Sequence, residues 1–246
     1  MIEAPRNPAG ERLALTFVPG RPDRRDLVVI GHGLTSHRDR PWLVAVSDQL
    51  QRRGVASLRV SFAGNGESEG RFEEATIQKE AADLGAVLDA VDAAAPGCRI
   101  AYAGHSMGAA VGLLRTVGDD RIQALVSLAG MVHVHAFMER HFGALTPGRD
   151  VMLGKPDCPL SQGFLDAART LGSLVELAPR VQVPWLLVHG TADDIVPLQD
   201  AVDAARHAGA GAHLRQLDGV DHRFTDCQAE TGALVADWLD RHWAQV

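Results

Sequence analysis

Apolar residues along the chain follow two spacings in turn, which predicts alternating strands and helices. Short apolar runs and strictly alternating stretches are typical of strands, and they lie at residues 13–18, 27–30, 55–60, 100–104, 122–128, 183–189 and 213–217. Helical spacing lies between these runs, at residues 41–53, 77–91, 107–117 and 198–208, and again in the last segment, which ends near Trp243. This alternation predicts an α/β fold with a mainly parallel sheet and helices on both faces.

Residues 131–181 break the alternation. This stretch contains four prolines and no clear repeat of strand and helix. It is too long for a connector in a compact domain, where loops run about 4 to 6 residues. We therefore expect a single domain over residues 1–246 that carries a small cap or lid at residues 131–181, with a second layer of core helices as the alternative. The apolar side chains of residues 131–181 could pack this segment onto the body, or they could line a pocket. These side chains are Phe137, Met138, Phe142, Leu145, Met152, Leu153 and Phe164.

Composition and charge exclude several classes of protein. Hydrophobic residues make up 46% of the chain and charged residues 22%, which is ordinary globular usage. The net charge of -7 argues against nucleic acid as a partner, because a duplex-binding surface needs a basic excess. The three cysteines lack the spacing of a disulfide framework or a zinc site. Neither a signal peptide nor a run of about 20 apolar residues is evident, so we expect a cytoplasmic protein that does not enter membranes.

The segment Gly104-His105-Ser106-Met107-Gly108 matches the pattern G-x-S-x-G between a predicted strand and a predicted helix. A turn this tight needs small neighbours on either side of the serine. It holds the serine at strained backbone angles and presents the hydroxyl at a helix N-terminus, where developing negative charge is favoured. The motif thus indicates a nucleophilic serine. A pattern this short also occurs by chance, so a serine in a structural turn is the alternative.

A serine hydroxyl is a poor nucleophile and needs a base, which in turn needs an orienting carboxylate. Candidates follow two later predicted strands: Asp193 and Asp194 after residues 183–189, and Asp221 and His222 after residues 213–217. Ligands bind at the carboxyl ends of parallel strands, so these loops can meet the serine motif at one edge of the sheet. The chain order Ser, Asp, His is that of one large hydrolase architecture.

Two further motifs are His32-Gly33 after a strand and the loop Gly64-Asn65-Gly66-Glu67-Ser68. Together with the serine motif and the two acid and histidine loops, they resemble the alpha/beta-hydrolase superfamily over nearly the whole chain. The match is closest to small-capped serine esterases, including feruloyl and cinnamoyl esterases. The sequence departs from this family at Ser61, where close relatives often carry an aspartate that braces the loop.

The resemblance implies a role for each candidate residue. Ser106 would be the nucleophile, His222 the general base and later the acid, and Asp193 the carboxylate that orients His222. The family pattern places this acid three residues before a Val-Pro pair, which favours Asp193, and Asp194 remains the alternative. Asp221 would shape the loop beside His222.

The oxyanion hole needs two backbone N–H donors, and the resemblance places them at Leu34 and Met107. The function it implies is hydrolysis of carboxylic esters of small to moderately apolar acyl groups, such as hydroxycinnamoyl esters, through an acyl-enzyme. The partner is then a small-molecule ester. A thioesterase or a peptidase would use the same residues on another leaving group, and a non-catalytic ligand receptor on the same fold is a further alternative.

The sequence disfavours two other kinds of site. The cluster His133, His135, Glu139 and His141 contains metal-ligand types, but it lacks the H-E-x-x-H pattern and any cysteine partner. The sequence Gly64-Asn65-Gly66 lacks the third glycine of a dinucleotide-binding motif at the required spacing. We therefore expect neither a metal nor a cofactor.

Overall fold

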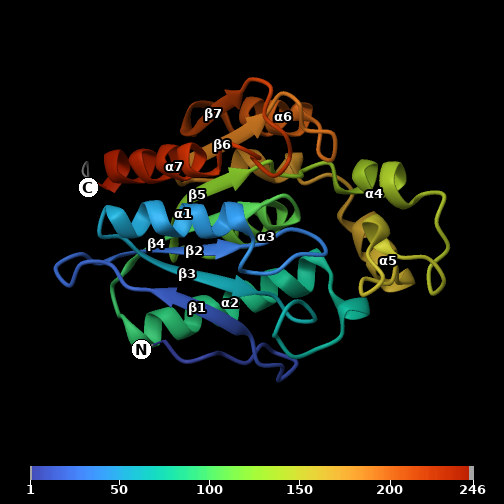
Figure 1. Cartoon of the computed structure of the whole chain (residues 1–246), viewed down its shortest axis with the longest axis horizontal. Coiled ribbons are helices and arrows are strands. Elements are labelled where there is room, and N and C mark those ends of the chain that lie inside the picture. The colour runs from blue at the N-terminus through green and yellow to red at the C-terminus, as the bar shows by residue number, and fades with distance from the viewer. Residues whose placement is uncertain (1, 244–246) are drawn as a thin grey trace.

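The computed structural model describes residues 2–243, which form a seven-stranded sheet between two layers of helices (Figure 1). The strand order is β1-β3-β2-β4-β5-β6-β7. In the described residues β1 is antiparallel to its neighbour β3, and all the remaining pairs of neighbouring strands are parallel. The strands are β1 (Ala14–Val18), β2 (Asp26–Gly31), β3 (Ala56–Ser61), β4 (Arg99–His105), β5 (Ile122–Leu128), β6 (Trp185–Gly190) and β7 (Ala212–Leu217).

The α-helices of the described residues lie between and after these strands. They are α1 (Pro41–Arg52), α2 (Ile77–Ala94), α3 (Met107–Thr116), α4 (Val134–Phe142), α5 (Gln162–Leu171), α6 (Leu198–Ala208) and α7 (Gln228–Trp243). The spacing of apolar residues predicts five of them, and two more lie within residues 131–181, where the spacing predicts no clear repeat. The predicted mainly parallel α/β architecture is confirmed, and the strand ends differ by only one or two residues. The largest shift is at β6, which begins after Pro184 because proline has no N–H to donate to the ladder. No helix in the described residues is both long and apolar enough to cross a membrane.

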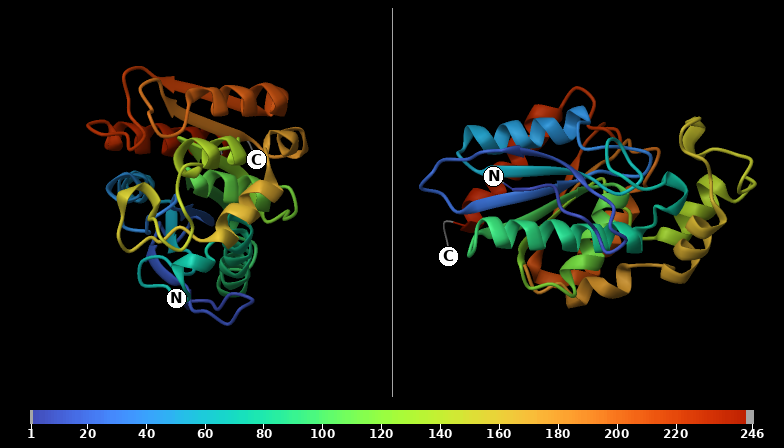
Figure 2. Two further views of the ribbon diagram at one scale, coloured as in Figure 1. Left: turned by 90° about the vertical axis from the view of Figure 1, so that its right-hand side faces the viewer. Right: turned by 90° about the horizontal axis from the view of Figure 1, so that it is seen from below.

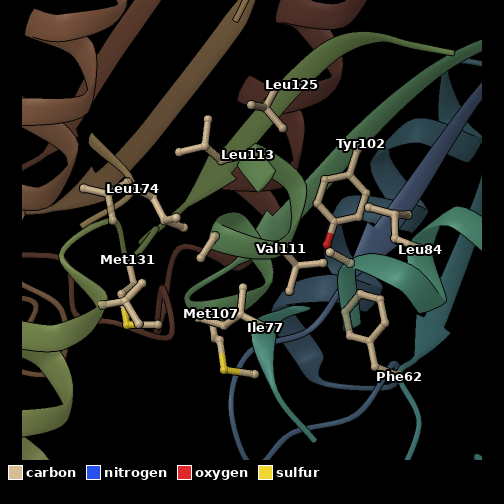
Figure 3. Packing of buried hydrophobic residues seen from close by; sticks show 14 of the residues in the cluster. Phe62, Ile77, Leu84, Tyr102, Met107, Val111, Leu113, Leu125, Met131 and Leu174 are labelled. Carbon is tan, nitrogen blue, oxygen red and sulfur yellow. The ribbon is translucent and has the colours of Figure 1, made fainter. Parts of the chain in front are cut away.

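The sheet separates two hydrophobic cores. Side chains alternate along the central strands, so in β4 Ile100 and Tyr102 enter one core, and Ala101 and Ala103 enter the other. The first core includes α2, α3 and parts of residues 131–181, and Figure 3 shows its packing around Tyr102. The second lies under α1 and α7. Helices cover both faces of the central strands as predicted, but edge strand β7 has no fully buried residue.

Tyr102 ties the sheet to the turn that begins α3. Its ring is fully buried in the first core, and its Oη donates a hydrogen bond to Gly108 O at 2.9 Å. The phenol therefore satisfies its own polar end inside an apolar core and holds the first turn of α3 against β4. This contact fixes the backbone that carries Ser106.

Residues 131–181 are here called the insertion, and their helices α4 and α5 project beyond the carboxyl ends of the parallel strands (Figures 1 and 2). The start of the insertion meets residues 172–174 at one neck. Leu174 N donates to Val132 O, and His135 N donates to Gly172 O, both at 2.8 Å. The buried carboxylate of Asp200 in α6 accepts a hydrogen bond from Val132 N, also at 2.8 Å. These bonds fix the neck to the body. The action of the insertion as a cap or lid remains a prediction.

A buried acid lies under the loop at residues 64–68. Glu80 of α2 is buried, and within the described residues its Oε2 has no hydrogen-bond partner. Its Oε1 lies 3.5 Å from Asn65 Nδ2. Burial, reinforced by the nearby Asp83, raises the pKa of Glu80 well above its usual range. The folded protein therefore favours the neutral carboxylic acid at this position.

The Glu80→Gln variant should melt at a higher temperature than the wild type at about pH 8, and this gain should shrink at about pH 5. The raised pKa of Glu80 stabilises the fold at acid pH, and this contribution is lost as the pH rises, because the unfolded chain releases the proton that the fold retains. A neutral amide removes this dependence. The melting temperatures of wild type, Glu80→Gln and Glu230→Gln at both pH values test this prediction. Glu230 is exposed, so Glu230→Gln is the control. An equal gain at both pH values would contradict the explanation.

Candidate active site

Ser106 lies at a strained turn between β4 and α3. Its backbone angles are φ 55° and ψ -119°, a conformation that non-glycine residues rarely adopt. A Cβ on Gly104 would lie 2.3 Å from Gly108 O, and one on Gly108 would lie 2.4 Å from His32 O. No side chain fits at either position, which is the physical reason for the two glycines of the motif. The Ser106 N–H donates to Leu128 O at 2.9 Å, which ties the turn to β5.

His222 and Asp193 come together from two loops. His222 follows β7, Asp193 follows β6, and His222 Nδ1 lies 2.8 Å from Asp193 Oδ2. The other carboxylate oxygen, Oδ1, accepts hydrogen bonds from Ile195 N and Val196 N, both at 2.9 Å. Asp194 is exposed and makes no contact of this kind with His222 in the described chain. The geometry thus pairs His222 with Asp193.

The carboxyl of Asp193 is ionised in this setting. Burial raises the pKa of Asp193, but hydrogen bonds from His189 and His222 outweigh it and hold the pKa below its ordinary value. An ionised Asp193 accepts the Nδ1–H of His222, which leaves Nε2 of that ring as the proton acceptor. This is the tautomer that a general base requires.

Two histidines that the sequence interpretation did not single out support this pair. His189 Nε2 lies 3.1 Å from Asp193 Oδ2, and His105 Nε2 lies 2.8 Å from His222 O. Burial, together with the charge of nearby His222, lowers the pKa of His105 to about 3, so this ring stays neutral and donates to the carbonyl. Both residues lie near the end of a strand that precedes a candidate residue, and this placement is the signal that could have identified them.

Ser106 and His222 line the same cavity, whose volume is about 580 Å³. Within residues 2–243 no hydrogen bond joins Ser106 Oγ to the imidazole of His222. Catalytic hydrogen bonds of this kind are often long until substrate is bound. The structure therefore brings all three candidate side chains to one place and makes one of the two hydrogen bonds between them.

The loop after β2 packs against the serine. A Cβ on Gly33 would lie 2.8 Å from Ser106 Cβ, and the next residue, Leu34, lines the cavity. Thr35 has a positive φ of 54°, which turns the chain away after Leu34. In the described part of the chain neither Leu34 N nor Met107 N donates to another protein group, and Met107 is the first residue of α3. Both N–H groups are therefore free to bind a ligand oxygen.

The Gly33→Ala variant should lose about 10²- to 10³-fold in kcat, the range found when one oxyanion donor is removed. The added methyl group would overlap the Ser106 side chain, so the loop must shift and carry the Leu34 N–H with it. Steady-state ester hydrolysis measures the effect, with Gly163→Ala as control because a Cβ at Gly163 meets no atom within 4 Å. Unchanged kcat in folded Gly33→Ala would exclude this loop from the reaction.

Two polar residues brace the surrounding loops. Ser61 is buried, and its Oγ accepts a hydrogen bond from Arg38 N at 3.1 Å, so a hydroxyl braces the loop where relatives often carry an aspartate. Asp221 accepts hydrogen bonds from Arg223 N at 3.1 Å and Thr225 N at 2.8 Å. Asp221 therefore shapes the loop that presents His222.

The histidines of the insertion do not converge. His133 Nε2 pairs with Asp203 Oδ2 at 3.0 Å, and His141 Nε2 lies 2.9 Å from Ile195 O. His135 and Glu139 are exposed. Among residues 2–243 no three side chains of metal-ligand type gather at one point.

The apolar residues of the insertion have two roles, and Phe137 has both. Phe137 and Leu153 line the cavity together with Trp42 and Ile195 of the body. The others pack into or against the hydrophobic core, where they join the insertion to the body: Met138, Phe142, Leu145, Met152 and Phe164. Both expected roles are therefore present among these side chains.

The mainly parallel sheet and the strained serine turn define an alpha/beta hydrolase. Residues 22–155 match the model of the Hydrolase_4 family, which is described as "Serine aminopeptidase, S33". The match covers more than half of the chain, and the chain belongs to this family.

Several known proteins are similar to the chain. The structure of Est1E from Butyrivibrio proteoclasticus with ferulic acid bound has a TM-score of 0.84 and 23% sequence identity, over 99% of this chain and 98% of that one. A monoglyceride lipase homolog of monkeypox virus is 21% identical over 232 residues, 80% of this chain and 82% of that protein. The mitochondrial palmitoyl-protein thioesterase ABHD10 of Bos taurus is 27% identical over 207 residues, 79% of this chain and 66% of that longer protein.

Proposed function

We propose that this hydrolase is a serine esterase that cleaves carboxylic esters through an acyl-enzyme. The observation that carries the proposal is the hydrogen bond of 2.8 Å between His222 and the buried carboxylate of Asp193, beside a cavity that the strained Ser106 lines. A hydroxyl, an imidazole and a carboxylate in this arrangement are the parts of a serine nucleophile with its base.

The reaction follows from the positions of these groups. Ser106 Oγ attacks the ester carbonyl carbon while His222 Nε2 accepts the hydroxyl proton, and Asp193 stabilises the imidazolium. The carbonyl oxygen becomes an oxyanion and receives hydrogen bonds from Leu34 N and Met107 N. The bond to the leaving alkoxide then breaks, and His222 returns its proton to that oxygen. A water molecule, deprotonated by His222, attacks the acyl-enzyme and releases the acid and free Ser106.

The walls of the cavity support an acyl group of small to moderate size with apolar character. Phe137, Leu153, Ile195 and Trp42 supply apolar and aromatic surface beside Ser106. Hydroxycinnamoyl esters are our first candidate, because Est1E, whose structure holds ferulic acid, shares the fold of the chain. The proposed reaction needs no cofactor.

Thioesters are the second candidate. A relative with 27% identity is named a palmitoyl-protein thioesterase, and the same three side chains can expel a thiolate in place of an alkoxide. Matched oxygen and sulfur esters of the same acyl group separate the two activities by their kcat/KM values.

The proposal is tested with a fluorophosphonate probe and a panel of p-nitrophenyl and hydroxycinnamate esters. We expect covalent labelling at Ser106 and turnover of several esters. Failure of the probe to label Ser106, together with no turnover, would reject the esterase and favour a ligand receptor on the same fold.

A further inference from the structure

Three cationic side chains line the cavity beside Ser106: Arg40, Lys155 and Arg223. In the residues that the structure describes, none of the three forms an ion pair with a carboxylate, and no Asp or Glu lines this cavity. Arg38, two residues before Arg40, does pair with carboxylates, at Asp39 and Glu67. The excess of positive charge is therefore local to the cavity, in a chain whose net charge is -7.

Two of these cations converge on one carbonyl oxygen. Lys155 Nζ, from the insertion, donates to Thr35 O at 2.6 Å, and Arg40 Nη2, at the start of α1, donates to the same oxygen at 3.5 Å. A single carbonyl dipole offsets little of the repulsion between two like charges this close. Burial and the charge of Arg40 accordingly lower the pKa of Lys155. A bound anion would remove this repulsion.

The same cavity is lined by residues with unused hydrogen-bond donors. Thr35 is 5% exposed, and its Oγ1 has no hydrogen-bond partner within residues 2–243. Trp42 Nε1 is buried without a partner as well, and an indole N–H can only donate. Buried polar groups are nearly always hydrogen-bonded, so these two unpaired groups on cavity-lining residues are compatible with a ligand that has acceptor oxygens.

We propose that the substrate is an ester that carries an anionic group, a carboxylate or a phosphate, which binds Arg40 and Lys155 while the ester carbonyl lies at Ser106. This inference rests on the proposed esterase function and specifies its substrate class. Arg223 lines the same cavity and adds a third positive charge. The apolar side chains Phe137 and Ile195 would contact the uncharged part of the same molecule, which is therefore amphipathic.

Matched pairs of esters that differ only in charge test the proposal. For an anion on the acyl half, the pair is p-nitrophenyl hydrogen glutarate and its neutral amide, p-nitrophenyl glutaramate. For an anion on the leaving group, the pair is 4-carboxyphenyl butyrate and 4-carbamoylphenyl butyrate. The quantity measured is the ratio of kcat/KM for the anionic ester to that for the neutral one. The pair with the higher ratio identifies the half of the substrate that carries the anion.

Variants relate this ratio to the named residues. Lys155→Met and Arg40→Gln should each lower the ratio by about 10- to 100-fold, the effect expected for hydrogen bonds between charged groups. Arg52→Gln is the matched control, because Arg52 is an exposed residue at the other end of α1 and does not line the cavity. It should keep the wild-type ratio. Added salt should lower the wild-type ratio, which supplies a test that needs no variant.

Each outcome decides the proposal. A charge preference that both cavity variants reduce and the control retains would support it. Equal ratios in wild type, Lys155→Met and Arg40→Gln, with neutral esters still hydrolysed and Ser106 still labelled, would overturn this inference and leave the esterase intact. No turnover of any ester and no labelling of Ser106 would overturn both.

Discussion

Ester hydrolysis should fall by about five to six orders of magnitude when Ser106 is replaced by alanine, the loss typical of a serine nucleophile. Without Oγ no acyl-enzyme can form, and only binding and the oxyanion donors remain to assist attack by water. Alanine has the same Cβ as serine, so it suits the strained turn no worse, and the fold should persist. Steady-state kinetics on the preferred ester give the magnitude.

The control for this prediction is Ser173→Ala, which removes a hydroxyl from an exposed residue of the insertion that does not line the cavity. This variant should keep both its activity and its labelling by the fluorophosphonate probe. Ser106→Ala should bind no probe while it melts as the wild type does. Turnover by purified Ser106→Ala above about one per cent of wild type would assign the chemistry to another group.

Replacing Asp193 by asparagine should lower kcat by about 10⁴-fold, because the amide favours the wrong tautomer of the His222 imidazole, the proposed base. Asp193 Oδ2 accepts from His222 Nδ1 at 2.8 Å, and only an acceptor at that position keeps the proton on Nδ1. An amide NH₂ facing His222 would reverse the direction of this hydrogen bond. The loss should appear in kcat, with little change in the labelled fraction after long exposure to the probe.

Asp194→Asn provides the matched control, since Asp194 is the adjacent carboxylate and is exposed. It should retain nearly full activity. The reverse result, with Asp194→Asn inactive and Asp193→Asn active, would transfer the orienting role to Asp194. Melting curves for both variants separate a loss of activity from a loss of folding, because Asp193 also accepts hydrogen bonds from Ile195 N and Val196 N.

The fold could be predicted because local spacing and global packing agree in this chain. Residues 122–128 have the apolar pattern of a strand and form β5 over the same residues. The order of the strands could not be read from the pattern, because an apolar run shows that a strand is buried but not which neighbours it pairs with. The exposure of β7 could not be predicted either, because β7 lies at the edge of the sheet and the pattern does not show the order of the strands.

The sequence could predict those residues of the candidate site that directly follow a strand. Ser106, Asp193 and His222 each lie in a loop at the carboxyl end of a parallel strand, and the topology brings these loops together. The support from His105 and His189 needed coordinates, because it depends on where each ring nitrogen points. The grouping of Arg40, Lys155 and Arg223 at the cavity also needed coordinates, because these residues come from three distant segments and nothing in their spacing relates them.

The neck of the insertion has a consequence for how such enzymes diversify. Because Val132 and Leu174 are joined by a hydrogen bond where the segment leaves and re-enters the body, its length and content can change without altering the distance that the chain must bridge. Lys155, Phe137 and Leu153 would be exchanged together in such a graft, whereas Ser106, His222 and Asp193 would stay in place. A transplanted insertion should therefore change only the part of the cavity wall that it supplies, whereas the cations Arg40 and Arg223 of the body stay in place.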